Sequence, residues 1–230
     1  QMNESKETCA PENVVLTDAE RWKSIDRRKA EDYIRKLQAR IVKAQREGKY
    51  GKVKSLQWLL THSFYGRYLA VVRVTTNKGK NTAGVDRVRW STDAAKVKAI
   101  DTLKRRGYQP MPLRRVEIPK KNGKKRPLGI PSFEDKLVQE VTRMMLEAIY
   151  EGYFDSNSHG FRPHRSCHTA LSKIQLEFTG TKWFIEGDIK GFFDNINHNV
   201  LIDILSKRIA DERFLRLLRK FLNAGYIEDW

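Results

Sequence analysis

The order of predicted elements along the chain indicates an α+β fold. Helical periodicity fills much of residues 17–74 and returns after residue 132, and a β-hairpin is predicted between these two regions. One further strand is predicted at Lys182–Asp188, followed by two more helices. Because helices and strands are grouped and do not alternate regularly, the pattern favours α+β over a parallel βαβ array.

The N-terminal part of the chain is predicted to be helical. Thr17 can cap a helix, and Glu20 stands three residues later, where it completes a capping box. Apolar residues then recur at helical spacing until Gly48, which predicts one helix, and a second helical pattern covers 51–74. Residues 77–87, NKGKNTAGVDR, have two glycines and no apolar period, which predicts a loop.

The middle of the chain carries a hairpin signal. LRRVEIP at 113–119 and RPLGIP at 126–131 have β character, and Asn122-Gly123 between them is typical of a tight hairpin turn. Caps and periodicity predict the remaining helices: Ser91, Thr92 or Asp93 begins one that ends at Gly107, Ser132 begins a long one, Ser166 begins another, and the last two cover about 198–208 and 211–223 before Gly225.

The charge of the chain points to a polyanionic partner. Lysine and arginine number 45 against 28 acidic residues, which gives a net charge of +17, and nucleic acid is the commonest polyanion. The excess is concentrated in residues 101–130, which hold ten lysines and arginines and two acids. This segment is predicted to form strands and turns, not a basic amphipathic helix, so binding to a membrane surface is disfavoured.

Other bulk features favour a reducing cytoplasm. No apolar run approaches the roughly 20 residues that a membrane-spanning helix needs, and the polar N-terminus lacks a signal-peptide core. Cys9 and Cys167 lie far apart without a CxxC pattern, so neither a disulfide framework nor a zinc site is indicated. We therefore expect a cytoplasmic protein.

FIEGDIKGFFDNINH, residues 184–198, carries the main chemical signal. An apolar strand delivers Asp188 to its end, and the carbonyl of Ile189 lies beside it; Mg²⁺ prefers such oxygen ligands together with substrate phosphates. Gly191 permits close backbone approach to a ligand, and the rigid ring of Phe193 could crowd a sugar 2′-position. The plain alternative is that Asp188 only begins the next turn.

This segment resembles the first palm motif of reverse transcriptases, in the form seen in group II intron-encoded maturases. NKGKNTAGVD, RRVEIPKKNGKKRPLGIPSFEDKLVQE and SHGFRPHRSCHTAL occur in the order of that family, so the resemblance covers about 77–230. It implies a reverse-transcriptase-like right-hand fold. Residues 1–76 would be an N-terminal helical extension, 77–180 the fingers with template loop and β-hairpin, and 181–230 the start of a palm truncated before the family's Asp-Asp hairpin.

The resemblance implies roles for residues around the nucleotide. Asp188 would be catalytic and a ligand of two Mg²⁺ ions, with the carbonyl of Ile189 as a further ligand. The nucleotide-binding residues would be Lys120, Arg126, Gly191, Phe192 and Phe193, with Phe193 as the gate against ribonucleotides. For Lys120 and Arg126 the alternative is a solvated basic edge of the sheet that prevents aggregation.

The resemblance also implies contacts with RNA or template. The residues concerned are Asn77, Lys78, Gly79, Lys80, Arg87, Arg114, Arg162 and Arg165. The family's loop usually ends in GVDG, whereas this chain has GVDR, so Arg87 puts the detailed turn in doubt. For Arg162 and Arg165 the alternative is ion pairing that ties the 158–165 loop to the fold.

The implied function is that of an RNA-directed DNA polymerase and splicing maturase of a group II intron. Its partners would be the intron RNA, an RNA template with a DNA primer, and dNTP, with no membrane; a homodimer is left open. Polymerase activity needs further carboxylates, which the family carries in its Asp-Asp hairpin. YIED at 226–229 follows a basic helix and not an apolar strand, so we do not expect it to be that hairpin, and we expect this chain by itself to be inactive. The alternatives are a non-enzymatic RNA-binding module and a retroelement or CRISPR-associated reverse transcriptase. A bacterial cytoplasm is favoured, with an organelle as the alternative.

Overall fold

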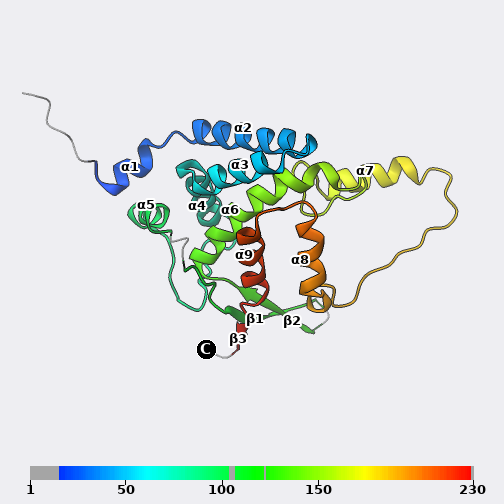
Figure 1. Cartoon of the computed structure of the whole chain (residues 1–230). Coiled ribbons are helices and arrows are strands. Elements are labelled where there is room, and N and C mark those ends of the chain that lie inside the picture. The colour runs from blue at the N-terminus through cyan, green and yellow to red at the C-terminus, as the bar shows by residue number, and fades with distance from the viewer. Residues whose placement is uncertain (1–15, 104–106, 122, 229–230) are drawn as a thin grey trace, which may run out of the picture.

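The computed structural model describes residues 16–103, 107–121 and 123–228. In these ranges the elements are α1 (Asp18–Ser24), α2 (Arg27–Arg46), α3 (Tyr50–His62), α4 (Phe64–Thr76), α5 (Asp93–Thr102), β1 (Leu113–Pro119), β2 (Lys125–Ile130), α6 (Phe133–Tyr150), α7 (Cys167–Glu177), α8 (His198–Ser206), α9 (Glu212–Leu222) and β3 (Tyr226–Ile227), with short 3₁₀ helices η1 (Glu151–Tyr153) and η2 (Phe193–Asn195). Figure 1 shows the helices gathered around α6, with the small sheet at one end of the molecule. The predicted α+β class is confirmed.

Each of the two long helices predicted near the N-terminus is in fact a pair. Asp26 separates α1 from α2, and its carboxylate accepts a hydrogen bond from the Lys29 amide at 3.0 Å. Ser63 separates α3 from α4, and its hydroxyl accepts one from the Gly66 amide at 2.8 Å. Both residues have extended backbone angles and begin a new helix, so local capping overrides a continuous apolar period.

One hydrophobic core joins the N-terminal helices to α6. Leu137 and Met145 of α6 are fully buried and belong to the same cluster as Ile41 of α2 and Leu56 and Leu60 of α3. Truncating one such side chain to alanine typically costs about 2–5 kcal/mol of stability, because it leaves a cavity. The helices before residue 77 are therefore packed into the same core as α6.

The sheet has the strand order β2-β1-β3. β1 and β2 pair antiparallel, from Arg114 opposite Ile130 to Pro119 opposite Lys125, as the hairpin prediction requires. β3 pairs parallel with β1, with Leu113 opposite Tyr226. This third strand was not predicted, because a two-residue strand has no periodicity to detect.

A buried carboxylate holds the start of the hairpin against α6. Asp135 is 2% exposed and accepts hydrogen bonds from the Tyr108 hydroxyl, from the Ser132 hydroxyl at 2.8 Å and from the Met111 amide at 3.1 Å. Burial, followed by the hydrogen bond to Asp135, raises the pKa of Tyr108. Lys220 of α9 donates to the Tyr108 carbonyl at 2.6 Å, so three elements meet at this point.

The strand predicted at Lys182–Asp188 does not form. These residues have no regular secondary structure and are exposed, including the side chains of Trp183, Phe184 and Ile185. In Figure 1 the connection from α7 to α8 swings away from the packed helices. A strand requires a neighbour for its backbone hydrogen bonds, and none of the described strands pairs with this segment, so its β propensity alone is insufficient.

Candidate nucleotide and nucleic-acid site

The hairpin places Lys120 and Arg126 on one face of its tip. Arg126 stands opposite Ile118, and Lys120 follows Ile118 by two residues, so strand alternation directs all three side chains to the same side. The turn closes through hydrogen bonds from the Gly123 amide to the Lys120 carbonyl at 3.1 Å and from the Lys120 amide to the Lys124 carbonyl at 2.6 Å. Both cationic side chains are exposed.

The acids near the hairpin lie on its opposite face. Glu117 pairs with Lys125 at 2.9 Å, and Glu228 pairs with Arg115 at 2.7 Å. Arg115 also lies over the Tyr226 ring, 4.5 Å from its centroid. The face of Lys120 and Arg126 is made by the even-numbered residues of 114–120 and 124–130, which include four cations, Arg114, Lys120, Lys124 and Arg126, and no carboxylate. Lys120 and Arg126 therefore present exposed positive charge at the tip, where an external anion could bind.

The 77–87 loop folds back against the start of α6. Lys136 donates to the Thr82 carbonyl at 2.6 Å. Gly84 lies so close to Ser132 that a β-carbon on it would come within 2.6 Å of the Ser132 Cα, so only glycine fits. Arg87 has a φ of 54°, a left-handed conformation that favours glycine, which explains the glycine of the usual GVDG pattern.

Lys136 is a candidate site residue that the sequence analysis missed. Burial lowers the pKa of Lys136, nearby Asp86 opposes that shift, and Arg114 adds to it, so both of these charges lie within electrostatic reach of Lys136. The Arg114 Nε is buried and has no hydrogen-bond partner within the described residues. A lysine in the first turn of an amphipathic helix resembles any surface lysine, and no sequence signal distinguishes it.

The loop residues Asn77, Lys78, Gly79 and Lys80 form the turn that leaves α4. The Asn77 carbonyl accepts from the Lys80 amide at 3.1 Å, and the Gly79 carbonyl accepts from the Thr82 amide at 3.0 Å. These bonds shape the loop. The Lys78 side chain is exposed and forms no ion pair within the described part of the chain. The role of this turn in template binding remains a prediction.

The Asp188 segment is exposed but locally shaped. Gly191 has a φ of +60°, and a β-carbon there would lie 2.9 Å from Asn195 Nδ2, which itself donates to the Gly191 carbonyl at 2.9 Å. Phe192 and Phe193 meet edge to face with ring centroids 5.5 Å apart, and Phe193 is 79% exposed. Glycine is thus favoured in the turn that presents the two rings.

Asp188 and Ile189 do not by themselves fit a magnesium centre. Mg²⁺ requires near-octahedral oxygen coordination, and two-metal catalysis needs several shared carboxylates. Among the residues that the structure describes, no three histidine, cysteine, aspartate or glutamate side chains gather as a metal site. Asp188 is exposed on an irregular segment, so we derive no metal-dependent step from it.

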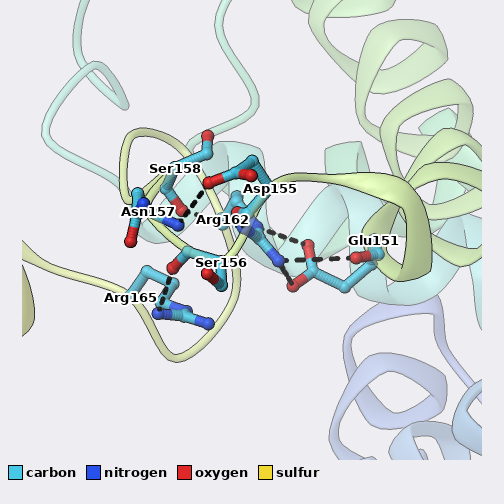
Figure 2. Close-up of polar contacts among 7 residues, drawn as sticks. All are labelled: Glu151, Asp155, Ser156, Asn157, Ser158, Arg162 and Arg165. Carbon is cyan, nitrogen blue, oxygen red and sulfur yellow. Dashed lines mark hydrogen bonds and ion pairs between the residues drawn. The ribbon is translucent and has the colours of Figure 1, made fainter.

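Arg162 is almost wholly committed to the protein. Its side chain is 7% exposed and pairs with Glu151 at 2.8 Å. The guanidinium also donates to the carbonyls of Asp155 at 2.7 Å and Ser158 at 2.8 Å and to that of Glu151 at 3.4 Å (Figure 2), so all five of its N–H groups are engaged. This geometry favours the alternative in which Arg162 ties the loop to the fold.

Arg165 is held more loosely. Figure 2 shows it directed toward Ser156, whose carbonyl accepts one bond at 3.2 Å. Its backbone precedes Ser166, whose hydroxyl accepts from the Thr169 amide at 3.3 Å and caps α7. Arg165 is therefore positioned on a capped loop with donors to spare.

Comparisons with known proteins identify the family of this chain. Residues 22–103 match the N-terminal domain of reverse transcriptase, and 118–230 match the reverse transcriptase (RNA-dependent DNA polymerase) family. The class is therefore that of reverse transcriptases. The group II intron-encoded protein LtrA of Lactococcus lactis subsp. cremoris is 50% identical over 177 residues, which cover 76% of this chain and 29% of that protein.

Two other relatives extend the comparison. A 91 kDa protein in the cob intron of Schizosaccharomyces pombe is 44% identical over 180 residues, covering 78% of this chain and 20% of its own length. Protein YkfC of Escherichia coli K12 is 42% identical over 167 residues, covering 68% and 44%. The chain belongs to the family of group II intron-encoded reverse transcriptases, and it spans less than half the length of these relatives. No helix in the described ranges has the length and apolarity to cross a membrane.

Proposed function

We propose that this chain forms the fingers and first part of the palm of an RNA-directed DNA polymerase that also acts as the splicing maturase of a group II intron. The observation that carries the proposal is the carboxylate-free face of the hairpin with Lys120 and Arg126 at its tip. LtrA, half identical over most of this chain, is by its name encoded by a group II intron.

In this proposal the hairpin binds the incoming dNTP through its phosphates. Lysine supplies a mobile point charge, and arginine a planar fork that can bind two phosphate oxygens. Glu117 supports this arrangement indirectly, because it neutralises Lys125 on the other face and not Lys120 or Arg126. If the hairpin were only a solvated basic edge of the sheet, its cations could lie on either face.

Asp188 and the carbonyl of Ile189 would serve the Mg²⁺ ions once further carboxylates are brought to them. Phe193 would stand against the sugar, with the amides of Gly191 and Phe192 toward the phosphates. The well-defined turn at Gly191 and the exposure of Phe193 support this assignment.

The 77–87 loop and Arg114 would contact the RNA template. Lys136 fastens this loop to α6 at Thr82, and the Arg114 Nε–H, which has no partner among the described residues, could donate to a phosphate oxygen. We infer that Lys136 positions the loop and does not itself touch the template.

Steady-state primer extension tests this role of the hairpin, with the complete polymerase that the proposal implies. Lys120→Ala and Arg126→Ala should each lower kcat/KM for dNTP by roughly ten- to a hundredfold, because one charge-assisted phosphate contact is worth about 1.5–3 kcal/mol. Lys125→Ala removes the same charge from the opposite face and is the matched control. Equal effects of all three substitutions would return the hairpin to the solvated-edge alternative.

A second candidate function is RNA binding without catalysis by the 230-residue chain. The exposed Asp188, with no metal-type cluster among the described residues, favours it for the chain taken alone. The purified chain should then bind intron RNA and fail to extend a primer in Mg²⁺. Template-dependent cDNA synthesis by this chain would exclude that candidate.

A further inference from the structure

A cleft of about 680 Å³ lies between α3, α6 and α9, apart from the hairpin face and the Asp188 segment. Its apolar lining includes Val141 and Met145 of α6 and Leu217 of α9. This volume falls within the range of pockets that hold small organic groups, roughly 300–1,000 Å³. Nothing in the polymerase assignment uses this cleft.

A stacked pair of rings stands on the α3 side of the cleft. The Trp58 and His62 centroids lie 4.0 Å apart with an interplanar angle of 18°. The His62 Nδ1 lies 2.7 Å from the Trp58 carbonyl, one helical turn back, which fixes the imidazole in place. Trp58 is nevertheless 51% exposed, so it offers a rigid aromatic surface to a ligand.

Gln57 supplies an unused hydrogen-bond donor in the same cleft. It is 4% exposed, and its Nε2 is buried without a hydrogen-bond partner among the described residues. Buried amide donors are nearly always paired, because an unpaired one loses its hydration without compensation. A ligand with a carbonyl oxygen or ring nitrogen would satisfy this donor.

The α9 side of the cleft is cationic. Arg213 and Arg216 line it and are exposed, and Lys220 lies one turn further along. Asp211 is the acid of this side, but it caps α9 by accepting from the Arg213 amide at 3.0 Å, and its ion pair with the Arg213 side chain is long, at 3.5 Å. Arg216 has no recorded ion pair within the described residues and is available to an anion.

We propose that this cleft binds an unpaired nucleotide of RNA, with the base stacked on Trp58, the base edge accepting from Gln57, and the adjoining phosphate on Arg213 and Arg216. Aromatic stacking combined with cationic backbone contacts is the usual way in which proteins bind single strands. A base within a duplex is already stacked on both faces, so the site selects loops, bulges or single strands. The net charge of +17 favours a polyanion over a neutral aromatic ligand.

The test is fluorescence anisotropy of the 230-residue chain with a short labelled single-stranded RNA and an abasic ribose-phosphate oligomer of equal length. We expect the wild type to bind the base-bearing strand more tightly. Trp58→Ala should weaken that binding roughly five- to a hundredfold and abolish the preference over the abasic strand. Trp58→Phe should restore much of it, because a ring remains.

Matched controls separate the cleft from the general charge of the protein. Tyr50→Ala removes a half-exposed aromatic ring from the same helix, outside the cleft, and should leave affinity unchanged. Arg216→Gln should weaken binding more than Arg28→Gln, which removes one exposed charge from α2.

Three outcomes would overturn the proposal: equal binding of base-bearing and abasic strands by the wild type, equal losses for Trp58→Ala and Tyr50→Ala, or a Trp58→Ala variant that changes only the sedimentation of the protein. The last result would make the cleft a protein interface. Because none of these measurements involves DNA synthesis, they are independent of the polymerase proposal.

Discussion

Replacing Arg162 by alanine should destabilise the protein far more than it weakens RNA binding. The substitution removes the ion pair with Glu151 and the bonds to the carbonyls of Asp155 and Ser158. Breaking one side of a fully buried ion pair costs about 3–5 kcal/mol, but a third of the Glu151 side chain is exposed and water can partly replace the arginine. We therefore expect a loss of about 2–4 kcal/mol in the free energy of unfolding.

Urea denaturation followed by circular dichroism measures this loss, and Arg165→Ala is the matched control on the same loop. Arg165 makes a single recorded bond, at 3.2 Å, so its removal should cost less than about 1 kcal/mol. Arg162→Lys should recover only part of the stability, because an ammonium cannot donate in the five directions of a guanidinium. If Arg162→Ala kept wild-type stability and lost RNA affinity, the loop-tying interpretation of Figure 2 would be wrong.

Tyr108 should make stability sensitive to alkali. The pKa of Tyr108 is raised in the folded protein, so its contribution to stability is complete below the unfolded pKa of about 10 and is lost as pH rises above that value, by up to about 1.4 kcal/mol per pH unit. Urea unfolding of wild type and Tyr108→Phe at several pH values isolates this loss. Parallel curves of stability against pH for the two proteins would refute it. RNA affinity should fall steeply with salt, with a slope of log K against log salt of order −3 to −7 if about four to eight phosphates are engaged, and filter binding that proved flat in salt would contradict an electrostatic interface. In the complete polymerase, Asp188→Asn should abolish cDNA synthesis while RNA affinity stays within a few-fold; wild-type synthesis rates would remove Asp188 from the metal site.

Local signals predicted most of the fold. The Asn122-Gly123 pair predicted the hairpin, and Ser132 and Ser166 predicted the starts of α6 and α7 because a capping hydroxyl acts within a few residues of itself. The prediction of a strand at Lys182–Asp188 was wrong because strand formation is not decided by local signals. A strand depends on neighbours that are often far away in the chain, and apolar content alone does not supply them.

The candidate site was predictable to the same extent. Lys120 and Arg126 were predicted from the family resemblance; the hairpin register places their side chains on one face, and their role in nucleotide binding stays a prediction. Lys136 and Gln57 were missed, since the burial of a polar side chain is a property of packing and leaves no pattern in the sequence. For Arg162 the sequence left two roles open, because an arginine suits both RNA binding and an ion pair. The positions of Glu151 and the loop carbonyls favour the ion pair.

The parallel pairing of β3 with β1 bears on the order in which the chain acquires its shape during synthesis. β2 ends at Ile130 and β3 begins at Tyr226, 96 positions later (226 − 130). At about 5–20 residues per second, a ribosome would take roughly 5–20 seconds to make the intervening chain. Throughout that interval the hairpin can already be closed while the outer edge of β1 stays unpaired and open to a foreign strand. Arg114 and Arg115 of β1, whose side chains project from opposite faces beside this edge, would then oppose such pairing by their charge until Tyr226 emerges.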